Sequence, residues 1–441
     1  MLVFTEAAHQ YQKDLVNYLV KNPKSGVFLD MGMGKTAICL YTFKWLKEKG
    51  LVDRALIIAP KYVALYTWGS EIKLWEDFKD LTINIAVGNE NTRFDAFEKP
   101  SDIVVINRDM VSWMMKSVSM KSFQVLIIDE LSSFKNPNSN RFRALAKIRH
   151  NFKYIWGLTG TPAPNTLMDL FSQAYLIEPE MFGYNFFAFR NKYFYKSGFQ
   201  WFIKKDRGSD ITDRLAMHCV SLKAEDYLNM PALMENHIKV KMDEKERIVY
   251  AKAFHDLVYT YKDGTKEDIK NLVIKLQQLA SGFYYETKTK KYEIVHTKML
   301  DRLEEIIDTA SSNVLLFYQF QADKDLITSR LKDIDVVELK TKESFENWNA
   351  GKIKVAMCHP RSVGYGMNLQ SGGNTVLWYG YTWELDTHLQ ANARLYRQGQ
   401  TKGVVVNYLY CENTIHEKIR TVLERKGNIQ DLVRAVLVMV R

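Results

Sequence analysis

Cysteine is scarce in this chain of 441 residues, and its four cysteines are far apart, with no pair at the spacing of a metal or disulfide motif. Zinc sites need closely spaced ligands, and disulfide-stabilised folds need a dense set of cysteines. Both kinds of site are therefore excluded. We interpret the four as buried thiols, at Cys39, Cys219, Cys358 and Cys411.

Long hydrophobic runs are also absent. No apolar stretch approaches the roughly 20 residues that a membrane-spanning helix needs. The first residues, Met1 to Glu6, contain neither a basic region nor an extended apolar one, so no secretory signal peptide is predicted. We therefore expect a cytoplasmic protein that does not associate with a membrane.

The composition that remains is globular, with 46% hydrophobic and 25% charged residues and no low-complexity tract. The length exceeds the usual range of one domain, so two core domains are expected. Lys and Arg outnumber Asp and Glu by 61 to 51, and this net charge of +10 favours a polyanionic partner. Charge alone does not separate a nucleic-acid-binding protein from a basic enzyme.

Two series of short apolar, β-rich runs alternate with helix-like stretches, which is the pattern of parallel sheets covered by helices. Between them, from about Leu167 to His296, such strands are missing and helical periodicity predicts helices at 245–257 and 268–279. The sequence therefore predicts an α/β protein with two parallel-sheet lobes and a helical insertion between them. The expected strands are 55–59, 103–106, 125–128 and 155–158, then 314–318, 335–339, 353–357, 375–379 and 404–409.

A phosphate-binding loop is predicted at residues 29–36, directly after the apolar pair Val27-Phe28. Glycines let backbone N–H groups close on phosphate oxygens, Lys35 can reach the β and γ phosphates, and the Thr36 hydroxyl can hold Mg²⁺. Leu29 stands where the usual pattern has its first glycine. Taken alone, the motif leaves open a Gly-rich turn between a buried strand and a helix.

An acidic pair, Asp129-Glu130, follows the predicted strand 125–128. In P-loop ATPases the first carboxylate completes the Mg²⁺ shell, and the second can orient and activate the attacking water. An isolated acidic pair is more often a solvated turn. Together with Lys35 and Thr36, the pair predicts an ATP site.

Arg394 and Arg397 lie three residues apart in the segment 390–400, which predicts that they share one face of a helix. Guanidinium groups that reach a γ-phosphate from another lobe stabilise the charge that develops in phosphoryl transfer. The alternative is two surface arginines on a solvated helix. The upstream phosphate-binding loop favours the functional interpretation.

In their order, these motifs resemble helicase superfamily 2, and in particular its Swi/Snf-like branch. That branch contains double-stranded-DNA translocases related to chromatin remodellers, and this chain resembles the minimal form found in phages and bacteria. The resemblance covers nearly the whole chain. The matching residues are Tyr11-Gln12, Asp30 to Thr36 (motif I), Ala59-Pro60 with Trp68 and Glu71 (Ia), Asp129-Glu130 with Lys135-Asn136-Pro137 and Ser139 (II), Leu158 to Pro162 with Asn165 (III), Val314 to Phe317 with Gln319-Phe320 (IV), Arg361, Gly364, Gly366 and Asn368-Leu369 (V), and Gln390 to Gln400 (VI).

The resemblance implies two RecA-like lobes, at residues 1–225 and 226–441, each with a helical protrusion. ATP and Mg²⁺ would bind in the cleft between the lobes, and cycles of closing and reopening would move the protein along DNA. Gln12 would select adenine, Thr36 and Asp129 would hold the metal, and Glu130 would activate water. The full implied set for nucleotide binding and hydrolysis is Gln12, Gly32, Met33, Gly34, Lys35, Thr36, Asp129, Glu130, Gly366, Arg394 and Arg397.

The resemblance also implies residues that act on DNA. Thr159 and Thr161 would couple the ATP site to DNA. Backbone contacts with DNA are implied for residues at strand ends, although each of these could equally be an exposed polar residue: Lys61, Asn107, Arg108, Gln319 and Arg361.

The chain departs from the family pattern at three places. Leu131-Ser132 stand where Ala-His usually follows the acidic pair, which removes an imidazole and puts the coupling between ATP site and opposite lobe in doubt. Val363 replaces a glycine that is common in motif V. Trp383-Glu384-Leu385 replace Trp-Asn-Pro before motif VI. The last two departures indicate a divergent subgroup with an altered grip on DNA.

A basic and aromatic run, residues 186–207, allows two interpretations. Aromatic rings could stack on unpaired bases while cations follow phosphates, and Trp201 and Phe202 at its centre would then wedge between strands. The favoured alternative is a helical core with a solvated basic face. The C-terminal segment 414–441 is predicted to be a helix that packs on a lobe through Ile415, Ile419, Val422 and Leu423.

The sequence therefore predicts an ATP-dependent DNA translocase or helicase for replication, recombination or repair, with duplex or branched DNA as its partner. A monomer in the bacterial or infected host cytosol is expected, with targeting supplied by the insertion or by other proteins. The alternatives are a non-catalytic or weakly coupled DNA-binding scaffold and the motor subunit of a restriction or recombination complex. An RNA helicase is disfavoured because Lys135-Asn136-Pro137 and the end of motif VI resemble the DNA branch.

Overall fold

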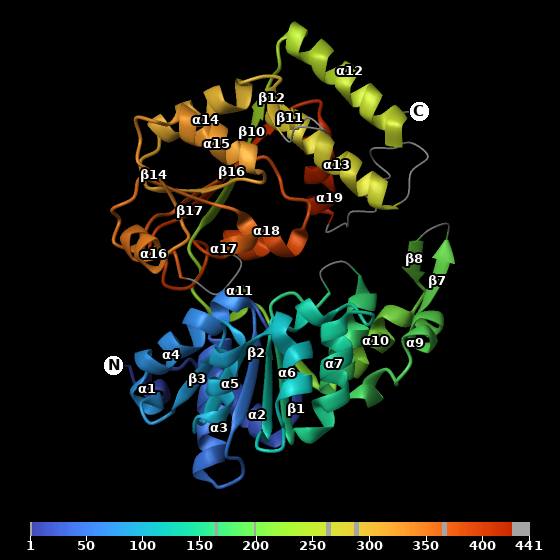
Figure 1. Ribbon diagram of the computed structural model, residues 1–441, viewed down its shortest axis with the longest axis vertical. Coiled ribbons are helices and arrows are strands. Elements are labelled where there is room, and N and C mark those ends of the chain that lie inside the picture. Colours follow the sequence, from blue (N-terminus) through green and yellow to red (C-terminus); the bar gives the residue numbers. More distant parts are fainter. Residues whose placement is uncertain are drawn as a thin grey trace. The chain divides into compact units, whose positions relative to one another are not determined.

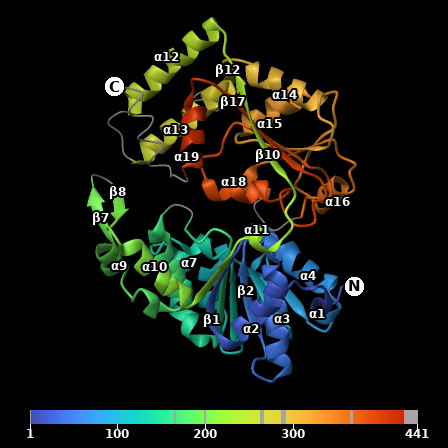
Figure 2. The same cartoon turned by 180° about the vertical axis from the view of Figure 1, so that it is seen from behind.

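The computed structural model describes residues 2–163, 166–197, 200–261, 266–285, 291–363 and 368–425. The chain divides into two compact units, Met1–Leu228 and Asn229–Arg441. Figure 1 shows both units coloured along the sequence, and Figure 2 shows them from behind. Each unit is built on its own parallel sheet.

A seven-stranded sheet forms the first unit, in the order β3-β4-β2-β5-β6-β1-β9, with all neighbours parallel. Every residue of β2, β4 and β5 is buried, so both faces of the sheet are covered. This burial explains their continuous apolar sequences. The strands are β1 (Lys24–Leu29), β2 (Ala55–Ala59), β3 (Ile83–Ala86), β4 (Ile103–Asn107), β5 (Val125–Asp129), β6 (Tyr154–Thr159) and β9 (Cys219–Leu222).

Helices connect these strands and cover the sheet (Figure 1). In a parallel sheet all strands end at the same edge, so residues that follow β1, β5 and β6, three consecutive neighbours, meet there. The helices are α1 (Phe4–Ala7), α2 (Gln10–Lys21), α3 (Lys35–Glu48), α4 (Trp68–Leu74), α5 (Glu90–Glu98), α6 (Val111–Ser117), α7 (Asn140–Ile148), α8 (Leu170–Ile177), α9 (Phe186–Tyr193), α10 (Arg207–Ala216) and α11 (Ala224–Tyr227).

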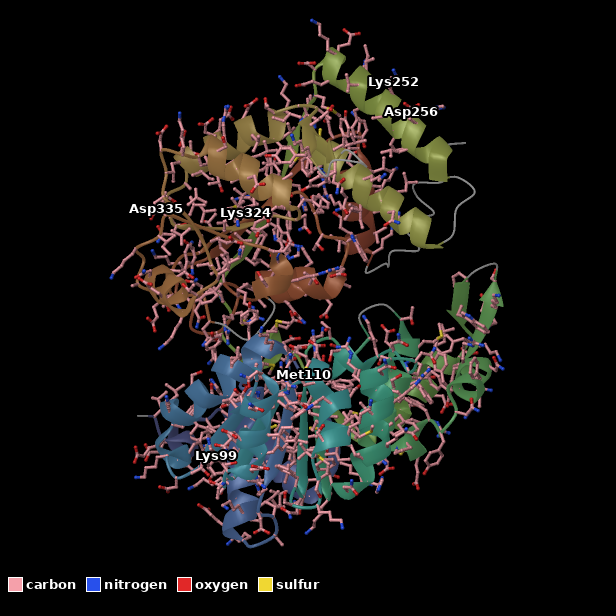
Figure 3. All side chains as sticks on the ribbon, viewed as in Figure 1. Lys99, Met110, Lys252, Asp256, Lys324 and Asp335 are labelled. Carbon is pink, nitrogen blue, oxygen red and sulfur yellow. The ribbon has the colours of Figure 1, made fainter. Side chains whose placement is uncertain are left out.

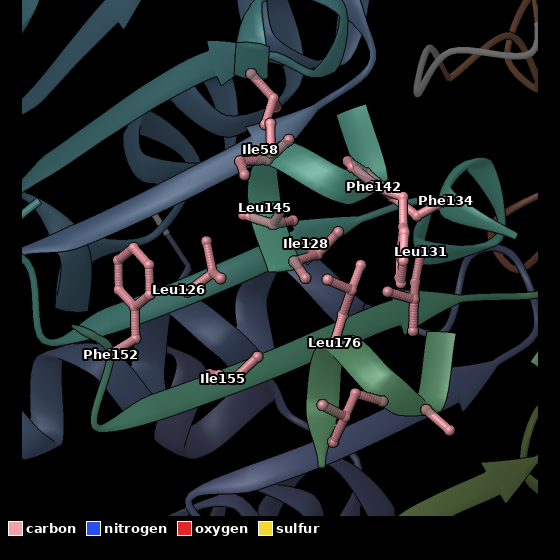
Figure 4. Close-up of a cluster of buried hydrophobic side chains, with 14 of the residues drawn as sticks. Ile58, Leu126, Ile128, Leu131, Phe134, Phe142, Leu145, Phe152, Ile155 and Leu176 are labelled. Atoms are coloured by element: carbon pink, nitrogen blue, oxygen red, sulfur yellow. The ribbon is translucent and has the colours of Figure 1, made fainter. Parts of the chain in front are cut away.

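A hydrophobic core beside β5 and β6 explains one departure from the family pattern (Figure 4). Leu131 is fully buried in this core, and Ser132 is buried as well. A Cβ at Gly157 of β6 would lie only 2.6 Å from Leu131 Cδ2, so the glycine makes room for the leucine. Leu131 is therefore a packing residue.

The second unit contains a six-stranded parallel sheet in the order β10-β17-β16-β13-β15-β14. At its β14 edge, Lys324 of α15 (labelled in Figure 3) forms an ion pair with Glu338. The carboxylate of Glu338 also accepts a hydrogen bond from the Tyr318 hydroxyl at 2.8 Å. The strands are β10 (Leu233–Val240), β13 (Val314–Phe317), β14 (Val336–Glu338), β15 (Val355–Cys358), β16 (Thr375–Tyr379) and β17 (Val404–Cys411).

The helices of the second unit include the two that the periodicity of the insertion predicts, α12 and α13. A two-stranded antiparallel sheet, β11 (Phe283–Tyr285) and β12 (Tyr292–Ile294), follows α13. The helices are α12 (Glu244–Tyr261), α13 (Lys266–Ser281), α14 (Lys298–Asp308), α15 (Gln321–Arg330), α16 (Lys342–Asn349), α17 (Pro360–Val363), α18 (Leu385–Asn392) and α19 (Ile415–Glu424).

The prediction of two parallel-sheet α/β lobes is confirmed, and each predicted strand is present within two residues of its expected ends. The prediction that 167–296 lacks such strands is wrong, because β9 joins the first sheet and β10 the second. Both are edge strands with exposed residues, and half of the residues of β10 are polar, in the sequence Leu-Met-Glu-Asn-His-Ile-Lys-Val. Their own sequences do not indicate strands, and pairing with β1 and β17 stabilises the extended conformation of β9 and β10.

The smaller predictions on packing have mixed outcomes. All four cysteines are buried thiols, as predicted. The apolar face of the C-terminal helix is buried in α19, whereas residues 426–441 lie outside the described part of the chain. None of the helices in the described ranges combines the length and the hydrophobicity that crossing a bilayer requires.

Candidate active site

The predicted phosphate loop lies between β1 and α3, which begins at Lys35. Gly32 and Gly34 have φ of 84° and 78°, the left-handed region that glycine adopts without strain. A Cβ at Gly34 would also lie 2.3 Å from Gln12 Nε2. The first backbone N–H groups of α3 have no partner within the helix, so the loop presents donors suited to an anion.

Hydrogen bonds from the first turn of helix α2 hold this helix against the loop. The Tyr11 hydroxyl and Gln12 Nε2 both donate to the carbonyl oxygen of Met33, at 3.0 and 3.2 Å. Gln12 Oε1 accepts from the backbone N–H of His9 at 2.9 Å. Burial raises the pKa of Tyr11 to about 12, so the hydroxyl remains a donor. Gln12 therefore lies at the loop, and its contact with adenine stays a prediction.

Lys35 lies beneath the loop. Its ammonium donates to the carbonyl oxygens of Leu29 and Asp30, at 2.7 and 3.1 Å. The Asp30 carboxylate in turn accepts from the backbone N–H of Ala224 at 2.9 Å, which ties the loop to α11. These contacts hold the loop in shape from both sides.

Asp129 ends β5 and is buried beside Lys35. Burial raises the pKa of its carboxyl, and the Lys35 ammonium is the largest of the influences that oppose this shift. Asp129 Oδ2 accepts from Trp68 Nε1 at 3.1 Å, and Oδ1 accepts from the backbone N–H of Glu130 at 3.0 Å. The structure therefore brings the two motifs of the predicted ATP site together.

Trp68 is a site residue whose role was not predicted from the sequence. A π-helical turn, Val63–Thr67, follows β2 and leads directly into α4, whose first residue is Trp68. Single π turns are frequent at functional sites. The indole is fully buried, and its N–H orients the carboxylate of Asp129. Its match to motif Ia was the only signal in the sequence.

Glu130 adopts a backbone conformation that is unusual for its residue type. Its φ is 54° and its ψ is 58°, in the left-handed region. Such a conformation in a non-glycine residue costs on the order of 1–3 kcal/mol and is concentrated at functional sites. The strain motivates the assignment of Glu130 as the residue that activates water.

Thr159 and Thr161 lie at the end of β6, next to the loop. Phe28 of β1 pairs in register with Thr159, whose hydroxyl accepts from the backbone N–H of Thr161 at 3.1 Å. Between them, a Cβ at Gly160 would approach the Leu29 carbonyl oxygen to 3.3 Å. The two threonines are thus placed beside the phosphate loop, while their coupling role stays a prediction.

The donors present fit a nucleotide with bound Mg²⁺. Thr36 is the second residue of α3 and offers a hydroxyl, and Asp129 offers a buried carboxylate. Magnesium prefers oxygen ligands, one or two carboxylates among them, and retains several waters. A Cβ at Gly34 would clash with the Gln12 side chain, so the loop keeps this close approach to α2 only with glycine at that position.

The second unit holds Arg394 and Arg397, but not on a helix. Helix α18 ends at Asn392, and both arginines lie in the turns that follow, so the prediction of a shared helical face is wrong. The side chain of Asn392, the last residue of the helix, accepts from Trp378 Nε1 and donates to the Tyr408 hydroxyl, both at 2.9 Å. Arg394 is 5% exposed, in contrast to a surface arginine.

A polar network supports this turn. The Tyr408 hydroxyl, which Asn392 contacts, donates to Glu235 Oε1 at 2.9 Å and lies 2.9 Å from His388 Nε2. Burial lowers the pKa of His388 to about 4, so its imidazole is neutral at pH 7. The network joins β10, β17 and α18 and fixes the point from which the arginine-bearing turn starts.

The predicted DNA residues have different environments. Lys61 is exposed after β2, whereas Asn107 is buried and accepts from the backbone N–H of Asp109 at 3.2 Å. Arg108 is half-buried, and its charge acts on the pKa of Asp129. Gln319 is half-buried, and within the described part of the chain its Nε2 has no hydrogen-bond partner.

Arg361 of motif V is exposed and forms a two-pronged ion pair with Glu384, with Nε at 2.9 Å from Oε2. Glu384 is one of the residues that depart from the family pattern, and the Thr387 hydroxyl donates to it at 2.8 Å. Any DNA contact of Arg361 therefore competes with this carboxylate. Asn165, Gly364 and Gly366 lie outside the described residues.

Comparison with known families decides the relationship. A family model described as the SNF2-related domain matches residues 11–299, about two thirds of the chain. The chain belongs to the SNF2-related domain family. This confirms the predicted Swi/Snf-like branch of superfamily 2 and, with it, the predicted class of enzyme, an ATPase of the helicase type.

Individual SNF2-related relatives differ in length. A protein of Acyrthosiphon pisum secondary endosymbiont phage 1 is 29% identical, with 96% of this chain and 97% of that protein aligned. An uncharacterized ATP-dependent helicase of Mycoplasma genitalium is 27% identical over 97% of this chain but 42% of its own length. A SWI/SNF-related regulator of chromatin from Xenopus tropicalis is 24% identical over 94% of this chain and 44% of its own length. The chain thus spans less than half of these two relatives.

Among solved structures, the Sulfolobus solfataricus SWI2/SNF2 ATPase core in complex with dsDNA aligns with 95% of this chain and 91% of that chain. The sequence identity is 22% and the TM-score 0.45.

Trp68→Phe tests the indole contact in this SNF2-related site. The substitution keeps an aromatic ring and removes the donor to Asp129, and hydrogen bonds to charged groups contribute about 1.5–3 kcal/mol. The Trp68 hydrogen bond lowers the pKa of Asp129, so its loss favours the protonated carboxyl. We expect a severalfold higher Mg²⁺ concentration for half-maximal ATPase activity, with a larger defect at pH 6 than at pH 8.

Trp156→Phe is the matched control for this experiment. Trp156 is a buried tryptophan of β6 whose Nε1 has no hydrogen-bond partner among the described residues. It should leave the Mg²⁺ dependence unchanged. Equal effects of the two substitutions would show that Trp68 acts through packing alone.

Proposed function

We propose that this protein is a DNA-dependent ATPase that moves along duplex or branched DNA. The observation that carries the proposal is that Lys35 and the Asp129-Glu130 pair meet at one edge of the first sheet, where β1 and β5 end on either side of β6. There the carboxylate of Asp129 lies in the field of the Lys35 ammonium. Membership of the SNF2-related family supports the same activity.

In the proposed mechanism, the backbone of the glycine loop and Lys35 bind the β and γ phosphates of ATP. Thr36 and Asp129 would hold Mg²⁺, which would neutralise the charge that develops on the phosphates. Glu130 accepts a proton from the attacking water. Arg394 and Arg397, which belong to the second unit, act on the same phosphates. Each cycle of hydrolysis changes how the two units bind DNA, and the protein thereby moves along it.

DNA is proposed as the partner on two grounds. The chain carries a net charge of +10, which suits a polyanion. The family to which it belongs includes relatives described as regulators of chromatin and as helicases. The relatives that are more than twice as long support a role for additional domains or partner proteins in targeting, in replication, recombination or repair.

The proposed partner predicts how nucleic acids affect ATP hydrolysis. Duplex or branched DNA should raise the ATPase rate several-fold, at least as well as single strands do. This stimulation should fade as salt increases, because each phosphate contact releases a condensed counterion on binding. Steady-state ATPase assays with blunt duplex, forked DNA, single strands and RNA at several salt concentrations measure both effects.

Each alternative has its own outcome in these assays. Equal stimulation by RNA and DNA would contradict the DNA assignment. Binding of DNA without ATP hydrolysis under any condition would indicate a scaffold. Hydrolysis that requires a co-purified protein would indicate the motor subunit of a restriction or recombination complex.

A further inference from the structure

A β-hairpin at the periphery of the first unit has no part in the proposed ATP site. Strands β7 (Phe194–Ser197) and β8 (Gln200–Ile203) pair antiparallel between α9 and α10, and both ribbon views show them projecting beyond these helices (Figures 1 and 2). The hairpin belongs to the basic and aromatic run 186–207. Its two faces have different surroundings.

One face anchors the hairpin to the unit. Phe194 is buried, and Trp201 packs against the hydrophobic core cluster of the first unit. The guanidinium carbon of Arg190 lies 4.1 Å from the centre of a Trp201 ring, a cation–π contact. The favoured prediction of a packed core is therefore confirmed for this face, and Trp201 is unsuited to wedge between strands.

The opposite face presents an aromatic pair to solvent. Tyr195 and Phe202 are directly opposite in the register, with ring centroids 5.8 Å apart and planes inclined by 31°. They remain 49% and 37% exposed. Burial in the core does not account for two adjacent rings that are this accessible.

Two cations lie beside the aromatic pair along the chain, and Lys196 belongs to the same hairpin face as Trp201, with which it pairs. Lys196 of β7 and Lys205 after β8 are exposed, and among the described residues neither has an acidic partner. By contrast, Lys192 and Arg207 both lie 4.0 Å from Asp210. The hairpin therefore combines partly exposed aromatic rings with two lysines that have no acidic partner among the described residues.

We propose that the hairpin binds unpaired nucleotides of DNA, with the bases on the Tyr195–Phe202 face and the phosphates at the neighbouring Lys196 and Lys205. Bases stack on aromatic rings irrespective of sequence, while ammonium groups contact the phosphates. An intact duplex keeps its base faces stacked internally, so the hairpin selects forks, overhangs and other single-stranded regions. The inference deepens the proposed function, because it assigns a part of the DNA substrate to a surface distinct from the motor site.

The Tyr195→Ala/Phe202→Ala double variant tests the proposal, with a dye-labelled oligothymidine and a forked duplex as probes. Stacking contributes about 1–3 kcal/mol per base, so affinity for oligothymidine should fall roughly tenfold or more. Affinity for blunt duplex and blunt-duplex-stimulated ATPase activity should stay within about twofold. Those two readouts report the proposed function independently of the hairpin.

Three further variants sharpen the result. Tyr184→Ala/Phe187→Ala removes two other exposed aromatics, 70% and 61% accessible, and should not affect oligothymidine binding. Tyr195→Phe/Phe202→Tyr keeps both rings and should bind like the parent. Lys196→Gln/Lys205→Gln should lower the log–log salt slope of binding by about 0.7 per lost phosphate contact.

Unchanged oligothymidine binding by the Ala double variant would overturn the proposal. So would equal losses on blunt duplex and oligothymidine, because the surface would then not distinguish unpaired nucleotides. Loss of folding, seen by circular dichroism, together with normal binding by the Lys196→Gln/Lys205→Gln variant, would assign the aromatic pair to packing.

Discussion

Glu130→Gln is expected to hydrolyse ATP about 10²- to 10⁴-fold more slowly than the parent protein, the range that general acid–base catalysis contributes, while it still binds ATP. Glutamine has nearly the shape of glutamate but cannot accept a proton from the attacking water. Glu130 also sits in a strained left-handed conformation directly after Asp129. Steady-state ATPase assays at saturating DNA, with equilibrium binding of a fluorescent ATP analogue, measure the two quantities separately.

Lys35→Ala provides the contrasting variant, because Lys35 supports the phosphate loop and would contact the phosphates themselves. It should weaken nucleotide binding first. Glu98→Gln, an exposed glutamate of α5, is the matched control and should behave like the parent. If Glu130→Gln hydrolysed ATP at the parental rate, the assignment of the catalytic base would be wrong.

Arg397→Ala is expected to lower the ATPase rate by about 10³-fold or more, the contribution of an arginine that stabilises the transition state of phosphoryl transfer. Binding of ATP should change much less, because the loop and its contacts lie in the first unit. Arg397→Lys should remain strongly impaired, since an ammonium lacks the planar fork of a guanidinium. Rates and nucleotide affinities of all three proteins should be compared at saturating DNA.

Arg397 suits this experiment better than Arg394, which is almost fully buried and whose truncation risks the local fold. Arg330→Ala is the control, because Arg330 lies on α15 in exposed ion pairs with Asp301 and Glu304. A loss of only a few-fold in Arg397→Ala would show that the second unit contributes no charge to hydrolysis.

The sequence predicts the buried centre of both sheets well because local composition dictates it. Strands covered on both faces need continuous apolar runs, and Val125 to Ile128 and Thr375 to Tyr379 show such runs. The phosphate loop is equally local, since its glycines, Lys35 and Thr36 are consecutive. For these elements, a few adjacent residues contain the information.

Contacts between distant segments could not be predicted in this way. The hydrogen bond from Trp68 to Asp129 joins residues 61 positions apart. Helix α18 ends at Asn392, whose side chain hydrogen-bonds to Trp378 and Tyr408 of neighbouring strands. A local spacing rule extends the helix to the arginines, and tertiary contacts override it.

The two-lobed parallel-sheet architecture, the family and the motifs of the ATP site can all be predicted from the amino-acid sequence. The edge strands that complete the sheets, the orientation of Asp129 and the exposure of the rings in the basic and aromatic run become known from the folded structure. The difference arises from the range of the interactions. Hydrophobic periodicity acts within a segment, whereas β9 and β10, Trp68 and the Tyr195–Phe202 face depend on partners that folding brings near.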